Sequence, residues 1–246
     1  MAREFIDTAS AGRLLRDLEA TASATLRRVV ADARDHIWLL ERIRTVDVNG
    51  DVEFQRQLCR HAGMRGKLRM RRDDLFAILD QFRRSETRTY PDLLMKISEL
   101  TGQVEKSVAS EILALLEPDQ PTIDREVREL LPRYGFYPLP ESPLFDECLA
   151  YHRELGHAMQ TVVALPAFAR LEARFDQAVG PASVLLSPLR KFNLQLSGSY
   201  RTVALMPNTE AAKKGMPRKE GVLHRPVPTS LPVISNRPGV RLHLCR

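Results

Sequence analysis

Apolar residues recur at intervals of three and four positions along almost all of the first 198 residues. This spacing places the apolar side chains on one face of each helix, and no segment shows the alternation typical of a strand. Short breaks with Pro or Gly, such as the one around Gly180, separate the periodic segments. The sequence therefore predicts an all-α fold, a helical bundle of about eight to ten helices with short links. The clearest segments are 14–43, 75–82, 93–100, 127–131, 145–163, 168–175 and 185–192.

The last part of the chain has a different composition. From Tyr200 to Arg246 there are nine basic and two acidic residues and six of the 16 prolines, without a sustained apolar period. The whole chain has a net charge of +6, so this segment at +7 leaves a balance of −1 for the remainder. A segment of this kind buries too little apolar surface to offset its ordering entropy. We expect a helical domain at 1–198 and a basic, Pro-rich, disordered C-terminal tail at 199–246.

Several classes of protein are disfavoured by composition. No apolar run approaches the roughly 20 residues that span a bilayer, and the N-terminus lacks a signal-peptide pattern, so we expect a cytoplasmic protein without membrane contact. The three cysteines, Cys59, Cys148 and Cys245, are too few and too scattered for a disulfide framework or an iron–sulfur cluster. His152 and His157 are five positions apart, which makes zinc ligands on one helix diverge. The sequence thus predicts no cofactor and no metal.

The segment 100–127, LTGQVEKSVASEILALLEPDQPTIDREV, interrupts the run of long helices. One helix is expected to end at Thr101 and Gly102, a second to begin near Val104, and a third to begin at Asp124. An aspartate at the start of a helix accepts hydrogen bonds from free backbone N–H groups and interacts favourably with the helix dipole. The segment therefore predicts a helix, a tight turn and a helix, followed by a capped third helix.

The order Leu-Thr-Gly-Gln-Val-Glu-Lys at 100–106 resembles the L-P-G-V-G-x-K hairpin of the helix-hairpin-helix DNA glycosylase superfamily, the endonuclease III-like branch especially. The resemblance covers about 94–136. Gly102 and Lys106 fall on the first glycine and the catalytic lysine of that motif. Asp124 falls on its catalytic aspartate, at the family's separation of 124 − 106 = 18 residues. The hairpin departs from the motif, since Thr101 replaces the proline and Val104 replaces the second glycine.

The resemblance implies a base-excision reaction on DNA. Lys106, as an unprotonated amine, would attack the sugar C1′ and form a Schiff base, and Asp124 would stabilise positive charge as the base leaves. The damaged nucleotide would have to leave the stack and enter a pocket. The resemblance also places Thr101, Gly102 and Gln103 in the turn that contacts the DNA backbone.

A basic segment lies upstream of this motif. Residues 60–72, RHAGMRGKLRMRR, include six basic residues and no acid, and we expect Arg65, Lys67 and Arg69 to follow a phosphate backbone. A solvated loop and helix start explains the same residues equally well.

A simpler interpretation also exists for the candidate catalytic residues. On a helical wheel Lys106 lies roughly opposite the face of Val104, Val108 and Leu115, as a solvated lysine would, and Asp124 is an ordinary helix cap. The first hypothesis for function is a DNA-binding protein of the DNA glycosylase type, with possible lyase activity. The alternative is a non-catalytic helical module that binds nucleic acid or a protein partner.

Overall fold

The computed structural model describes residues 6–205, and within this range it contains α-helices and short 3-10 helices but no strand. The prediction of an all-α protein is confirmed. Ten α-helices lie within these residues, in agreement with the expected number. In chain order they are α1 (Thr8–Ile43), α2 (Val52–His61), α3 (Gly66–Met70), α4 (Arg72–Arg84), α5 (Tyr90–Thr101), α6 (Lys106–Leu116), α7 (Arg125–Leu130), α8 (Phe145–Val163), α9 (Phe168–Val179) and α10 (Pro188–Leu205), with 3-10 helices η1 (Leu131–Tyr134) and η2 (Pro181–Leu185).

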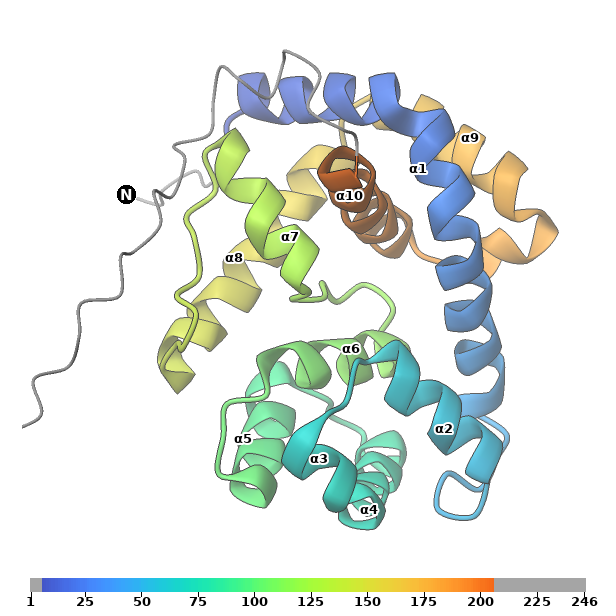
Figure 1. Cartoon of the computed structure of the whole chain (residues 1–246), viewed down its shortest axis with the longest axis vertical. Helices are drawn as coiled ribbons and strands as arrows, with labels where there is room; N and C mark the ends of the chain where they lie inside the picture. Colours follow the sequence, from blue (N-terminus) through green and yellow to red (C-terminus); the bar gives the residue numbers. More distant parts are fainter. Residues whose placement is uncertain (1–5, 206–246) are drawn as a thin grey trace, which may run out of the picture. The chain divides into compact units, whose positions relative to one another are not determined.

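Helix α1 is the element against which much of the described chain packs. It has 36 residues and begins after Asp7, whose carboxylate accepts a hydrogen bond from the Ser10 backbone N–H at 2.6 Å. Its buried face contacts α10, which lies beneath the bend of α1 in Figure 1, and α1 also contacts α2, α6, α8 and α9. A turn follows this helix at Asp47 to Gly50, where the Gly50 N–H donates to the Asp47 carbonyl at 3.1 Å.

The remaining helices form two groups along α1. The first follows α2 and includes the consecutive contacts of α3 with α4, α4 with α5 and α5 with α6. The second consists of α7, α8 and α9 around α10 (Figure 1). Helix α6 belongs to the first group and also contacts α1, so residues of α1, α2, α6 and α10 meet in one region.

Helix α10 extends past the predicted end of the helical domain. The boundary after residue 198 lies inside this helix, which continues to Leu205. The serines and Gly198 in this stretch suggest a break in the sequence, but Ser197, Ser199 and Thr202 are buried. Small side chains are required here because α10 packs closely against α1, and the sequence pattern of one helix does not reveal that requirement.

Part of the predicted tail, 206–246, lies outside the described residues and includes Cys245. Within 6–205, Cys59 is a partly buried free thiol and Cys148 a buried one. In the same range, no helix combines the length and apolar character needed to cross a bilayer.

Candidate functional site

A cavity with a volume of about 380 Å³ lies where residues of α1, α2, α6 and α10 meet the start of α7. Cavities of this size are typical of small-ligand sites. With every carboxylate ionised, the lining has five carboxylates and three guanidinium groups, a balance of 3 − 5 = −2. Its charged residues are Asp32, Asp35, Arg60, Glu111, Asp124, Glu126, Arg190 and Arg201, accompanied by His61.

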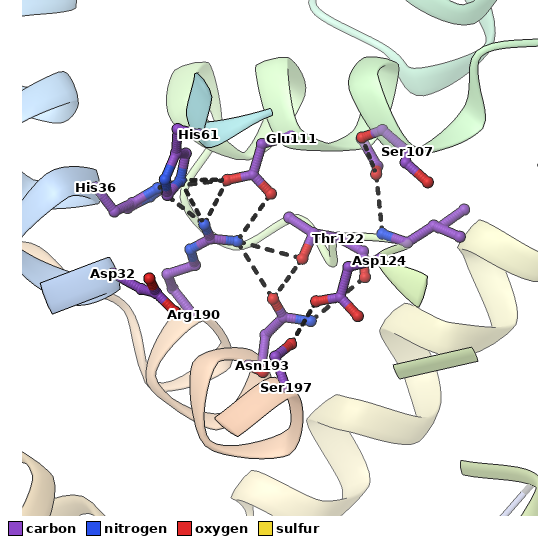
Figure 2. A network of polar contacts seen from close by, with 12 residues as sticks. Asp32, His36, His61, Ser107, Glu111, Thr122, Asp124, Arg190, Asn193 and Ser197 are labelled. Atoms are coloured by element: carbon purple, nitrogen blue, oxygen red, sulfur yellow. Dashed lines mark hydrogen bonds and ion pairs between the residues drawn. The ribbon is translucent and has the colours of Figure 1, made fainter. Parts of the chain in front are cut away.

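The centre of the cavity wall is an ion pair between Arg190 of α10 and Glu111 of α6 (Figure 2). Both residues are buried, with exposed fractions of 4% and 9%. Arg190 Nη2 donates to Glu111 Oε1, and Nη1 lies 3.3 Å from Oε2, so the guanidinium spans the carboxylate. Burial alone would raise the pKa of Glu111, but Arg190 and the neighbouring histidines outweigh it and hold the pKa well below its usual value. Glu111 is therefore ionised at neutral pH.

Two histidines complete this cluster. His36 Nδ1 of α1 and His61 Nε2 of α2 lie 3.1 Å apart, and Arg190 Nη2 lies 2.9 Å from the first and 3.1 Å from the second. His61 Nε2 also lies 2.7 Å from Glu111 Oε1. Burial and the nearby Arg190 lower the pKa of His36 to about 3, so this imidazole is neutral at physiological pH.

Asp124 lies on another part of the cavity wall, at the N-terminus of α7. It is the N-cap of that helix, as predicted, and its carboxylate accepts a hydrogen bond from the Val127 N–H at 2.6 Å. The Ser197 hydroxyl of α10 donates to its other oxygen. Burial raises the pKa of Asp124 to about 7, although the bonds from Ser197 and Val127 act in the opposite direction. At neutral pH this carboxyl group exists in both protonation states.

Asn193 and Thr122 link the Asp124 end of the network to Arg190. Arg190 Nη1 lies 3.2 Å from both Thr122 Oγ1 and Asn193 Oδ1. The side-chain amide of Asn193 donates to the Thr122 backbone carbonyl at 3.3 Å. The backbone carbonyl of Asn193 accepts from the Ser197 hydroxyl at 3.2 Å. A continuous set of buried polar groups thus joins Asp124 to the ion pair (Figure 2).

Lys106 is the first residue of α6 and does not line this cavity. It is half-buried, and its Nζ donates to the Glu141 carbonyl at 3.4 Å. Burial lowers its pKa, and Arg128 adds to this effect. Within residues 6–205, no hydrogen bond or ion pair joins Lys106 to Asp124, so their joint action in catalysis stays a prediction.

The turn between α5 and α6 lies at the predicted position, directly after Thr101. Gly102 ends α5 with φ of 69°, a conformation that favours glycine. Thr101 is buried, and its hydroxyl donates to the Ile97 and Gln103 carbonyls and accepts from the Gln103 N–H. Gly102 and Gln103 are exposed, and no side chain caps the N-terminus of α6. Thr101 therefore holds the turn, whereas its two neighbours face solvent.

The basic segment lies beside this turn. Arg65, Lys67 and Arg69 are exposed around the short helix α3, which is anchored by buried Leu68. A β-carbon at Gly102 would lie 3.9 Å from Lys67 Nζ. Two segments that the sequence predicts separately as DNA contacts are thus neighbours.

His152 and His157, the pair rejected as zinc ligands, have different surroundings. The His152 ring is buried and stacks on Tyr90 with centroids 3.8 Å apart, whereas the His157 side chain is 67% exposed.

Sequence reasoning missed the cluster of Arg190, Glu111, His36 and His61. One local signal was present, because Glu111 follows Val108 by three positions and precedes Leu115 by four, which puts a charge on the apolar face of its helix. His36 likewise precedes Leu40 by four positions. Compared with protein-family models, curated proteins and solved structures, the chain shows no match. Its function must therefore be inferred from this geometry.

Proposed function

We propose that the protein binds DNA through the α5–α6 turn and the neighbouring basic segment, and that it acts on an extruded nucleotide as a DNA glycosylase does. The observation on which this proposal mainly rests is the proximity of Lys67 Nζ to Gly102. A lysine beside an exposed turn and an uncapped helix N-terminus suits a phosphate, since the free N–H groups and the ammonium both attract an anion. The turn and the two helices around it lie where the resemblance would place a helix-hairpin-helix element.

The catalytic part of the proposal assigns Asp124 to the cleavage of the N-glycosidic bond. Its carboxyl group borders the cavity and has a pKa of about 7, so its ionised form is available to stabilise positive charge on the sugar or to accept a proton from attacking water. Ser197 and the Val127 N–H fix the carboxylate in place. A rigid carboxylate requires little reorganisation when charge develops in the transition state.

Lys106 has the second assigned role, that of a Schiff-base nucleophile in a lyase step. Its lowered pKa favours the neutral amine that such a reaction needs. Its amine is bonded to the Glu141 carbonyl, and release from that contact would have to precede attack.

DNA binding is tested by replacing Arg65, Lys67 and Arg69 with alanine and measuring affinity for a duplex across a range of salt concentrations. We expect weaker binding and a shallower salt dependence, because each lost phosphate contact reduces the number of counterions released. Arg153, Arg170 and Arg174 of α8 and α9 provide a control of equal charge change. Equal losses in the two triple variants would show that net charge alone is responsible.

The chemical step is tested with a duplex that carries an oxidised base or an abasic site. Borohydride reduction should trap wild type on DNA through Lys106, and Lys106→Gln should abolish the crosslink, whereas Lys96→Gln should not. Asp124→Asn should retain DNA binding and lose base release. Base release without a crosslink would assign hydrolysis to Asp124 alone.

A second candidate is the non-catalytic helical module, which binds nucleic acid or a protein partner. The specific observation in its favour is that Lys106 is absent from the cavity lining and bonds to Glu141. DNA binding without base release and without a crosslink on any lesion would support this module.

A further inference from the structure

We propose that His36, His61 and Glu111 form a binding site for a divalent cation of the zinc type at the edge of the cavity. The ion would replace Arg190 Nη2 and would lie closer to the three donor atoms than that nitrogen does. This site is independent of the DNA-binding residues proposed above.

The three donor atoms converge at the spacing that such an ion requires. His36 Nδ1 and His61 Nε2 are 3.1 Å apart, and Glu111 Oε1 lies 2.7 Å from the second and 3.6 Å from the first. Ligands of a tetrahedral zinc ion, with bonds of about 2.0–2.1 Å, lie about 3.3 Å from one another. Three helices that are distant in the sequence therefore provide a triangle of nearly the correct size.

The chemistry of the donors also suits this class of ion. Two imidazole nitrogens and one carboxylate oxygen are a common ligand set of zinc sites that keep one coordination position open. His61 and Glu111 line the cavity, so that open position faces a space accessible to water or a small ligand. His36 lies behind them and is 1% exposed.

Arg190 Nη2 marks the place of the ion because it contacts all three donors. It lies 2.9 Å from His36 Nδ1 and 3.1 Å from His61 Nε2, and it donates to Glu111 Oε1. A positively charged group thus already contacts the three atoms that would bind a cation. The Arg190 Nε atom is buried without a hydrogen-bond partner, so the guanidinium is held through its terminal nitrogens alone.

The charge of the cavity accommodates an additional cation. The lining has a balance of −2 when every carboxylate is ionised, and a divalent ion would bring it to −2 + 2 = 0. Arg190, once displaced from the donors, would remain in a cavity that is also lined by the acids Asp32, Asp35, Asp124 and Glu126. Mutual repulsion of the two cations would thereby be reduced.

The test is titration of the full-length chain, first treated with a chelator, with zinc chloride by calorimetry and with cobalt(II) chloride by visible absorption. We expect one ion per chain and the cobalt spectrum of a four- or five-coordinate site. Loss of a ligand in His61→Ala or Glu111→Gln should weaken binding by more than the roughly 10–100-fold that loss of an outer-shell partner costs. The control variants are His157→Ala on an exposed helix surface and His224→Ala, and both should bind as wild type does.

Arg190→Met tests whether the Arg190 guanidinium competes with a metal ion for the three donor atoms. Removal of the guanidinium leaves Glu111 without a positive partner, so this variant should bind zinc more tightly than wild type. Zinc should also raise the unfolding temperature of wild type and not that of His61→Ala, a readout that needs no chemical activity. Absence of zinc binding by wild type would overturn the proposal, even if Arg190→Met binds, because Arg190 would then be the permanent cation. Unchanged binding in His61→Ala would overturn it as well.

Discussion

Gly198 of α10 lies so close to Val29 of α1 that a β-carbon at this position would overlap the Val29 side chain. The same β-carbon would lie 3.0 Å from Thr25 Cγ2. We expect Gly198→Ala to destabilise the protein by about 1–3 kcal/mol, because overpacking outweighs the higher helix propensity of alanine. The measurement is urea denaturation followed by circular dichroism.

Gly12→Ala in α1 is the matched control for that substitution. Its β-carbon would meet only Arg16 Nη1, at 3.6 Å, so alanine should stabilise the helix by about 0.5–1 kcal/mol. If Gly198→Ala stabilised the protein as Gly12→Ala is expected to do, this result would contradict the close approach of α1 and α10.

The buried pair of Glu111 and Arg190 should show strong non-additivity. Glu111→Leu leaves Arg190 buried without its carboxylate and is expected to cost about 3–5 kcal/mol of unfolding free energy. The double variant Glu111→Leu, Arg190→Met removes both charges and should cost less than the sum of the two single changes. A double-mutant cycle in urea measures this coupling. Glu19→Gln removes the exposed partner of Arg170 and should leave the midpoint of urea denaturation unchanged.

Asp124 predicts a specific dependence of stability on pH. Its pKa is about 7 in the folded protein and 3.8 in a model peptide, so the folded state retains a proton that the unfolded state has lost. This contribution to stability is complete below pH 3.8 and is lost as the pH rises to about 7. Asp124→Asn removes this dependence and keeps a residue suited to a helix cap.

The effect of Asp124→Asn is measured as the difference in unfolding free energy between wild type and the variant at each pH. The unfolding free energy of wild type minus that of the variant should fall as pH rises, by up to about 1.4 kcal/mol per unit. The opposite contribution of His36, whose low pKa favours the folded state at higher pH, is present in both proteins and cancels. A difference that stays constant from pH 4.5 to 8 would contradict burial of the carboxyl group.

The contacts at the end of α10 predict a difference in stability between two shortened chains. A chain that ends at Met206 keeps the Arg201–Asp32 ion pair, the Tyr200–Glu129 hydrogen bond and buried Thr202, whereas one that ends at Ser199 loses all of them. We expect the shorter chain to be less stable by about 1–2 kcal/mol, since each buried or partly buried polar contact contributes roughly 1 kcal/mol. Equal thermal unfolding temperatures would show that the last turns of α10 contribute nothing.

The helices and the cap at Asp124 were predictable because their signals are local. Apolar spacing is a property of neighbouring residues on one helix, and the Asp124 carboxylate bonds to an N–H three residues later. The ion pair was not predictable in this way, since Glu111 and Arg190 are separated by 79 positions. Its members had only a weak signal, a polar residue on an apolar face.

The end of α10 was also not predictable from local sequence, because the helix continues where its own residues indicate a loop. Ser197, Gly198 and Ser199 have low helix propensity and look like the start of a loop. In the structure Ser197 bonds to Asp124, and Gly198 permits the close approach to Val29. The bond to Asp124 and the approach to Val29 both depend on residues outside α10, so the sequence of α10 alone does not predict them.

The pairing of α1 with α10 has a consequence for synthesis of the chain. Helix α1 leaves the ribosome first, but its main partner ends at Leu205, and contacts such as Arg201 with Asp32 join positions 169 residues apart. Until α10 emerges, the part of α1 that packs against α10 and the carboxylate of Glu111 lack the partners that cover them. Contacts of such long sequence separation form late and slow the folding of a helical protein. The nascent chain must therefore keep this part of α1 uncovered until α10 is made.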